Sequence, residues 1–391
     1  MFFCTQQNVA KRHFIIILLT LFGTSVAGTV KASDNKDQND YVKISKKKLP
    51  KVNGRLAFDA VRYQSDVTHM GSGIEIRYAR LSVKGRVDQK WKYRLEYDFA
   101  GKGSIKNVWL AYQLKRSHSI KIGNLMEPFS MDEMTSSKNI SFLERALPNA
   151  FVPSYHLGVV LNSRHSGFSF SGGAFGGTPS SNPPNEGSQG YGVSGRMTYA
   201  PIETQKTLLH FGLSASASVP DSTKTVRFRE RPESNLTSVR LVDTGKINNV
   251  VHDAIGGLEA AAMLGPVALQ GEYIKARVVR TGSEAPLLFK GAYTQMSVLL
   301  GDALRSYKHG TFGTIKTTGD VGVWELALRY SYLDLNSNDI SGGEEHNLTF
   351  GINYYFNPRL RMMANYIKAR AYHGGITEQP KIFTVRIQAY F

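Results

Sequence analysis

The sequence predicts an all-β protein, a transmembrane antiparallel β-barrel of about 16 strands. Three observations predict this fold. The last ten residues alternate with a period of two, strand-like segments of about ten residues recur along the chain, and no run of about 20 apolar residues follows the first 32 residues. Taken together, they favour a membrane protein that crosses the bilayer with strands.

The C-terminal segment shows the alternation most clearly. From 382 to 391 the odd positions are all apolar and end on Phe391, whereas Arg386 and Gln388 lie on the even face. A wholly apolar face that ends in an aromatic residue is typical of the last strand of an outer-membrane barrel. The last strand of a soluble sandwich fits this one segment equally well, so the other segments must decide.

The same parity recurs in the earlier segments. In 91–99 the aromatic and aliphatic residues lie on one face, and Lys92, Arg94, Glu96 and Asp98 occupy the other. A charged face is wrong for the core of a soluble sandwich but right for a wet lumen. The segments 107–114, 191–199, 325–332, 348–356 and 360–366 follow the same rule.

The N-terminus predicts export. A basic group at 11–13 precedes the apolar run 14–22, and Val30-Lys31-Ala32 resembles a cleavage site. We therefore expect residues 1–32 to be a signal peptide and the polar residues 33–51 to form an N-terminal periplasmic extension. The only cysteine, Cys4, would leave with the signal, which excludes disulfide and thiolate metal sites in the mature chain.

Composition fits a charged barrel of residues 52–391. Cleavage would remove three cations, so the formal net charge falls from +17 to +14. The mean hydropathy of −0.26 is compatible with a lipid-facing protein, because each strand contributes one apolar and one polar face. A positive surplus of this size favours an anionic partner.

Two long connectors are chemically distinctive. Residues 126–156 mix hydroxyl, basic and aromatic side chains, and residues 221–249 carry four arginines, three of them at alternate positions 227, 229 and 231. Alternate residues of an extended segment project in the same direction. Short connectors such as 356–358 are typical of periplasmic turns.

With these features, the chain resembles the phosphate-selective porins O and P, anion-specific trimeric porins of Gram-negative outer membranes. The similar blocks are spread over nearly the whole mature chain. They are 52–56, 76–81, 91–93 with 97–98, 120–123, 135–138, 143–145, 324–325, 348–355 and 365–369.

The resemblance implies a sixteen-stranded trimeric barrel whose third loop, here 126–156, folds inward as a constriction. It also implies that basic residues bind the anion. The constriction candidates are Arg55, Arg77, Lys138 and Arg145. The candidates for an arginine ladder along the wall, in the Arg-rich loop 221–249, are Arg227, Arg229, Arg231 and Arg240, with Arg80 and Lys92 as further lumen cations.

The chain departs from the family pattern at two positions. The second of two paired arginines is Tyr78, and an acidic residue of the fourth strand is Lys106. Both changes bear on strict phosphate selectivity, but neither removes the anion preference that the resemblance implies.

The physical chemistry of these side chains agrees with anion transport. Arginine binds phosphate oxygens through two parallel hydrogen bonds and stays charged, and rings of Arg and Lys in a pore select anions. We therefore expect an outer-membrane porin, a passive anion-selective channel for phosphate or polyphosphate. The alternative is a general or weakly anion-preferring porin without a specific phosphate site.

Other functions find less support in the sequence. An outer-membrane enzyme needs a nucleophile near a base, for which Ser166 with His165 and His156 are the only suggestion, and a closed surface barrel or adhesin is a further alternative. The histidines show no metal-site spacing, and we expect no metal and no cofactor. Expected partners are inorganic phosphate or other anions, outer-membrane lipid and lipopolysaccharide; export disfavours nucleic acid.

Overall fold

The computed structural model describes residues 49–179, 187–282, 285–317 and 322–391. The predicted signal peptide, and the predicted extension up to residue 48, lie outside the described residues. Strand β1 begins at Lys51, one residue earlier than the boundary that the sequence suggested. No helix in the described ranges is long and apolar enough to cross a membrane.

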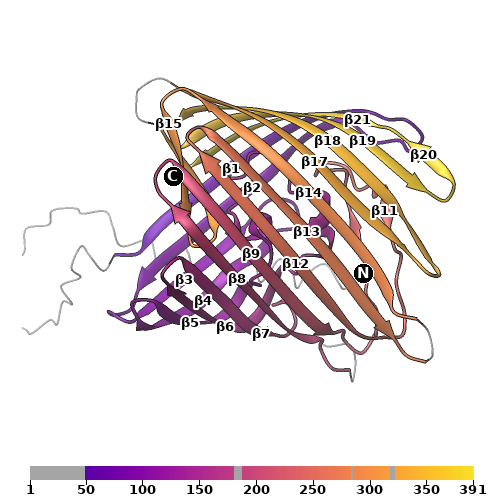
Figure 1. The fold of residues 1–391 in the computed structure, drawn as a ribbon, viewed down its shortest axis with the longest axis horizontal. Coiled ribbons are helices and arrows are strands. Elements are labelled where there is room, and N and C mark those ends of the chain that lie inside the picture. The colour runs from indigo at the N-terminus through magenta and orange to yellow at the C-terminus, as the bar shows by residue number, and fades with distance from the viewer. Residues whose placement is uncertain (1–48, 180–186, 283–284, 318–321) are drawn as a thin grey trace, which may run out of the picture. The chain divides into compact units, whose positions relative to one another are not determined.

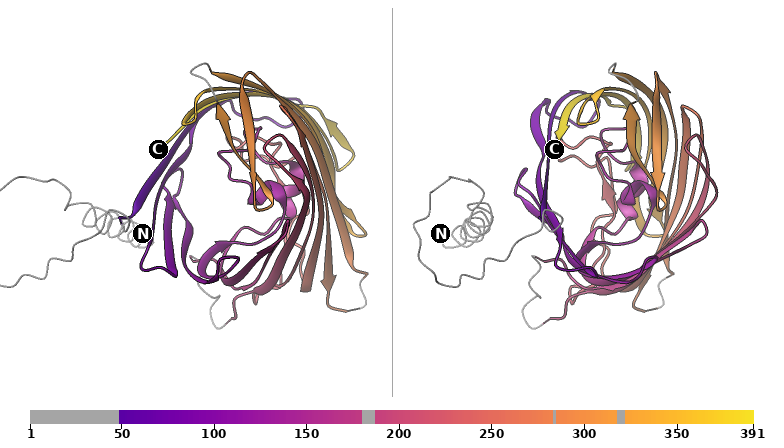
Figure 2. Two further views of the ribbon diagram at one scale, coloured as in Figure 1. Left: turned by 60° about the vertical axis from the view of Figure 1, so that its left-hand side comes forward. Right: turned by 90° about the vertical axis from the view of Figure 1, so that its left-hand side faces the viewer.

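Sixteen antiparallel strands form one closed barrel, as predicted, and Figure 2 shows them as a ring. Their bounds are β1 (Lys51–Gln64), β2 (Gly73–Arg86), β3 (Trp91–Asp98), β4 (Ser104–Lys115), β5 (His118–Met126), β6 (Tyr155–His165), β7 (Phe168–Phe175), β8 (Tyr191–Glu203), β9 (Thr207–Val219), β12 (Val250–Leu264), β13 (Val267–Arg280), β14 (Leu287–Leu300), β17 (Val323–Ser337), β18 (Ile340–Asn357), β19 (Leu360–His373) and β21 (Lys381–Tyr390). A short strand β20 (Ile376–Glu378) extends the last hairpin along β19.

The barrel closes between its first and last strands. β1 pairs with β21 from Arg55 opposite Tyr390 to Gln64 opposite Lys381. The terminal Phe391 exchanges two backbone hydrogen bonds with Gly54, at 3.0 and 3.1 Å. A Cβ at Gly54 would lie 2.0 Å from the Phe391 ring, so a larger residue at this position would require the ring to move. Phe391 therefore extends the pairing of the first and last strands by two hydrogen bonds.

Side chains alternate between the exterior and the lumen as the sequence predicted. In β21 Phe383 and Ile387 are 48% and 46% exposed on the outside, whereas Arg386 and Gln388 are buried inside. Lipid offers no water to the backbone, and closure of the barrel gives the N–H and C=O groups of every strand a hydrogen-bonding partner strand. The apolar exterior faces the hydrocarbon. The lumen is consequently lined by polar and charged groups.

The two ends of the barrel differ. At one end, which also carries the chain terminus Phe391, the connections 87–90, 116–117, 166–167, 204–206, 265–266 and 358–359 are tight turns. We call this the short-turn end. The opposite, long-loop end carries the segments 127–154 and 220–249, which contain α2 (Met131–Met134), η2 (Leu147–Phe151), β10 (Arg229–Glu230) and β11 (Val242–Asp243). The predicted loop limits were wrong by one or two residues, because Met126, Tyr155 and His156 belong to strands.

One connection at the short-turn end is not a turn. Between β14 and β17 the chain forms a hairpin of β15 (Ala303–Lys308) and β16 (Thr311–Thr317), labelled at β15 in Figure 1. Arg305 of this hairpin bonds Ser297 and Glu325, and the carbonyl of Gly310 accepts from Arg196. These partners face the lumen, so the hairpin folds into the barrel. The sequence analysis did not predict it.

Candidate functional site

The third loop, residues 127–154, lies inside the barrel (Figure 2) and is held there by hydrogen bonds to the wall. The backbone amides of Met131 and Asp132, at the start of α2, donate to the carboxylate of Glu272 at 3.1 and 2.7 Å. On β19 and β21, four and five strands further around the barrel, Arg361 and Arg386 donate to the backbone carbonyls of Ile140 and Leu143 at 2.9 and 2.7 Å. The loop is thus attached to the wall at two places, on β13 and on β19–β21.

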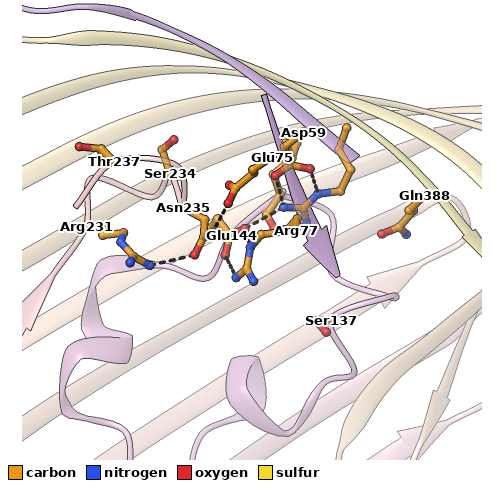
Figure 3. A network of polar contacts seen from close by, with 12 residues as sticks. Asp59, Glu75, Arg77, Ser137, Glu144, Arg231, Ser234, Asn235, Thr237 and Gln388 are labelled. Carbon is orange, nitrogen blue, oxygen red and sulfur yellow. Dashed lines mark hydrogen bonds and ion pairs between the residues drawn. The ribbon is translucent and has the colours of Figure 1, made fainter. Parts of the chain in front are cut away.

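A carboxylate of this loop joins two arginines of the barrel wall. Arg77 donates from Nε and Nη2 to the two oxygens of Glu144, both at 2.7 Å, and Arg386 donates to Glu144 at 2.7 Å. Arg386 also forms two hydrogen bonds of 2.6 Å with Asp59. Figure 3 shows Arg77, Glu144 and Asp59 in this network.

The electrostatics of Glu144 reflect these partners. Burial alone would raise the pKa of its carboxyl group, but the charges and hydrogen bonds of Arg77 and Arg386 outweigh burial and lower the pKa from 4.5 to about 2. Glu144 is therefore ionised at neutral pH and neutralises part of the positive charge around it.

Arg55 differs from the arginines around it. Its side chain is buried on β1 and donates to the hydroxyl and backbone carbonyl oxygens of Ser137, at 2.6 and 3.2 Å. Its Nε has no hydrogen-bond partner, and it forms no ion pair with a carboxylate within the described residues. A buried guanidinium without a counter-charge is costly, and an anion in the lumen would relieve that cost.

Two cavities meet beside Arg55. One of about 390 Å³ extends toward the short-turn end and is lined by Arg80, Arg94, Lys106 and Lys121. The other, of about 200 Å³, extends toward the long-loop end and reaches Arg231. Arg77, Tyr78, Ser137 and Arg145 line both cavities, and we call the place that these four residues share the junction.

The remaining predicted constriction residues lie in the third loop. Arg145 lines the junction but is engaged within its own loop: it pairs with Glu133 at 2.6 Å and donates to the backbone carbonyls of Glu133 and Thr135. Lys138 lies over the ring of Tyr390, and burial, with the charges of Lys84 and Arg55, lowers the pKa of its amine. Lys138 forms no ion pair in the described part of the chain.

The two predicted lumen cations project inward from β2 and β3. Arg80 donates to Asp98 at 2.6 Å, which neutralises part of its charge. Lys92 donates to the side-chain oxygen of Gln113 at 2.9 Å and lies nearer the short-turn end. Lys106 of β4, noted in the sequence only as a departure, lines the 390 Å³ cavity with Arg80.

The predicted ladder arginines all lie in the loop 220–249 but occupy different surroundings. Arg227 pairs with Asp243 at 2.7 Å, and Arg229 lies 4.0 Å from the same carboxylate. Arg231 donates to Asn235, which in turn donates to Glu75 of β2 (Figure 3). Arg240 donates to two backbone carbonyls of its own loop. Of these four, Arg231 lies at the cavity that leads to the constriction.

Sequence reasoning missed several residues of this site. Arg386 was placed only on the even face of the last segment, and Glu144 appeared only within the block 143–145, although together they anchor the third loop. Arg196, within the predicted segment 191–199, pairs with Glu259, which accepts a further bond from His210 at 2.9 Å. These partners are separated along the chain, and only the inward position of Arg386 and Arg196 could be predicted from the alternation.

The residues considered for catalysis are not brought together. His156 lies at the start of β6, and its ring Nδ1 is hydrogen-bonded to the Glu127 carboxylate at 2.7 Å. Ser166 follows the end of the same strand. Ten residues of strand separate them, about 33 Å at 3.3 Å per residue. The described residues also contain no cluster of His, Cys, Asp and Glu able to hold a metal ion.

Comparison with known proteins decides the family. The family described as "Phosphate-selective porin O and P" matches residues 51–391. The chain belongs to this family. It is therefore a porin, an integral protein of the outer membrane, as the sequence predicted.

Two relatives and one solved structure are similar to the chain. Porin O of Pseudomonas aeruginosa is 25% identical over 370 residues, 82% of each chain. An uncharacterized protein of Caulobacter vibrioides is 31% identical over 296 residues, 71% of this chain but 58% of that protein, so the match spans little more than half of that relative. The anion-selective porin of Comamonas acidovorans shares the fold, with a TM-score of 0.56 at 13% identity, over 88% of this chain and 100% of the other.

Proposed function

We propose that this porin is a passive anion-selective channel and that its preferred solutes are phosphate and polyphosphate. The buried guanidinium of Arg55, which has no carboxylate partner among the described residues, is the observation that carries the proposal. Membership of a family described as phosphate-selective, and the similarity to Porin O, agree with it.

The charges around Arg55 also support anion selectivity. Arg77 and Arg80 are each paired with one carboxylate, but Arg55, Lys106 and Lys138 form no ion pair within the described chain. The junction therefore keeps an uncompensated positive charge, which attracts anions and repels cations. Several binding sites of moderate affinity in series, rather than one site of high affinity, allow an anion both to bind and to leave.

The path that we propose runs from the long-loop end to the short-turn end. Arg231 and the other ladder arginines draw the anion into the 200 Å³ cavity, where Arg77 and Arg145 of its lining contact the anion. Arg55, which donates to Ser137 of that lining, and Lys138 of the third loop add positive charge. Arg80 and Lys106 of the 390 Å³ cavity then receive it on the far side, with Lys92 nearer the short-turn end. We place the long-loop end outside the cell, as the lengths of the connectors suggest.

The test is phosphate inhibition of chloride current through single channels in lipid bilayers, in wild type and in Arg55→Gln. Loss of a charged donor should raise the phosphate concentration that halves the current by about tenfold or more. Arg62→Gln is the matched control, because Arg62 lies on the same strand with its side chain exposed on the outer face. Wild-type current that phosphate does not inhibit would favour the general porin instead.

We also propose that the protein forms a homotrimer in outer-membrane lipid and lipopolysaccharide. β3 and β7 have eight residues each, fewer than the nine to eleven or so that a tilted strand needs to cross a bilayer. β17 and β18, on the other side, have 15 and 18. The low wall at β3–β7 would be covered by neighbouring copies. Native mass spectrometry of the detergent-solubilised protein tests this, and a monomer would refute it.

A further inference from the structure

One aromatic ring stands among four arginines at the constriction. The centroid of the Tyr78 ring lies 3.9 Å from the guanidinium carbon of Arg55, 4.3 Å from that of Arg77 and 4.5 Å from that of Arg80. The guanidinium carbon of Arg386 lies 5.3 Å away. A guanidinium within about 6 Å of an aromatic centroid is attracted by the ring quadrupole. Tyr78 therefore contacts every arginine that surrounds the junction on β1, β2 and β21.

Tyr78 orders these arginines without neutralising them. The carboxylates of Glu144, Asp98 and Asp59 hold Arg77, Arg80 and Arg386 by ion pairs, and each pair cancels charge. A phenol ring is neutral, so contact with it leaves the guanidinium charge available to a solute. This distinction matters most for Arg55, which contacts the ring and donates to Ser137 and Gln388 but has no carboxylate partner in the described chain.

The hydroxyl group of Tyr78 is placed to contact that solute. The residue is only 4% exposed, yet it lines both cavities, so its small open surface faces the junction. Within the described residues no hydrogen bond to this hydroxyl is formed, in contrast to Tyr63, Tyr293 and Tyr355, whose buried hydroxyls all have partners. A phenol can donate one hydrogen bond, and an oxyanion is a strong acceptor.

We propose that Tyr78 is a specificity-determining residue of the anion path, which selects tetrahedral oxyanions over halides. Its ring holds Arg55, Arg77 and Arg80 in fixed positions, and its hydroxyl donates to one oxygen of the anion while the arginines bind the others. A halide has a single centre and cannot reach all these donors at once. The inference rests on the proposed function, because it requires that anions pass this junction.

The test uses the full-length protein in planar bilayers and the variant Tyr78→Phe, which keeps the ring and removes the hydroxyl. We expect the phosphate concentration that halves chloride current to rise about tenfold, whereas the chloride-to-potassium permeability ratio changes less than twofold. Tyr273→Phe is the control, since this tyrosine is 44% exposed on the barrel exterior.

A second variant tests the ring. Tyr78→Leu removes both the π-system and the hydroxyl, and we expect weaker phosphate inhibition together with a lower chloride-to-potassium ratio, because the arginines lose their common contact. If Tyr78→Phe leaves phosphate inhibition unchanged while Arg55→Gln weakens it, the role of the hydroxyl is refuted and the anion channel stands. A wild-type channel without anion preference would refute the proposed function itself, and this inference with it.

Discussion

At the scale of single residues, the constriction is built from charges that are compensated to different degrees. Glu144 gives Arg77 and Arg386 a shared counter-charge, Arg80 has its own carboxylate in Asp98, and Arg55 has none within the described residues. The paired arginines hold the third loop and the wall together. In the function that we propose, the unpaired Arg55 is the one available to the solute, so its partners rather than its position distinguish it from the other arginines.

Glu144 makes the attachment of the third loop depend on pH. The pKa of Glu144 is about 2 in the folded protein and 4.5 ordinarily. Its contribution to the free energy of unfolding is therefore complete above about pH 5 and is lost as the pH falls through 2. The difference corresponds to roughly 3 kcal/mol. Thermal unfolding in detergent, followed by circular dichroism, should show wild type more stable than Glu144→Gln at pH 7, with the gap closing toward pH 2. A gap that does not change with pH would contradict this assignment.

At the scale of elements, three segments enter the barrel: the third loop, the loop 220–249 and the hairpin β15–β16. The loop 220–249 is fixed by Glu233, which is 3% exposed and binds Arg329, Ser331 and Thr349 of the wall. Arg329 is itself only 1% exposed, so each group depends on the other for its buried charge.

Removal of Glu233 should therefore release the loop 220–249. Glu233→Ala leaves the Arg329 guanidinium buried without its carboxylate, and breaking a buried pair in this way costs about 3–5 kcal/mol. We expect faster proteolytic cleavage within 220–249 and a larger, noisier single-channel conductance. Asp221→Ala, at the start of the same loop, is the control and should change neither. Equal protease resistance of wild type and Glu233→Ala would show that the loop is held by other contacts.

At the scale of the whole molecule, the barrel and its inside–outside pattern could be predicted from the sequence because strand alternation is local. In β21 the alternation predicted that Arg386 faces the lumen. What it could not predict is which carboxylate each arginine meets: Arg386 and Glu144 are 242 residues apart and come together only through the barrel and the inward loop. The inward position of the hairpin 303–317 was missed for a related reason, since one of its partners, Arg196, lies 114 residues from Gly310 along the chain.

The zero-current potential of the wild-type channel across a tenfold gradient of potassium chloride tests the central claim most directly. If the positive charge of Arg55, Lys106 and Lys138 faces the solute, the potential has the sign set by chloride, and it shrinks in Arg55→Gln but not in Arg62→Gln. A potential with the sign set by potassium would mean that these cations do not face the conducting path, and the account of this lumen as an anion filter would be wrong.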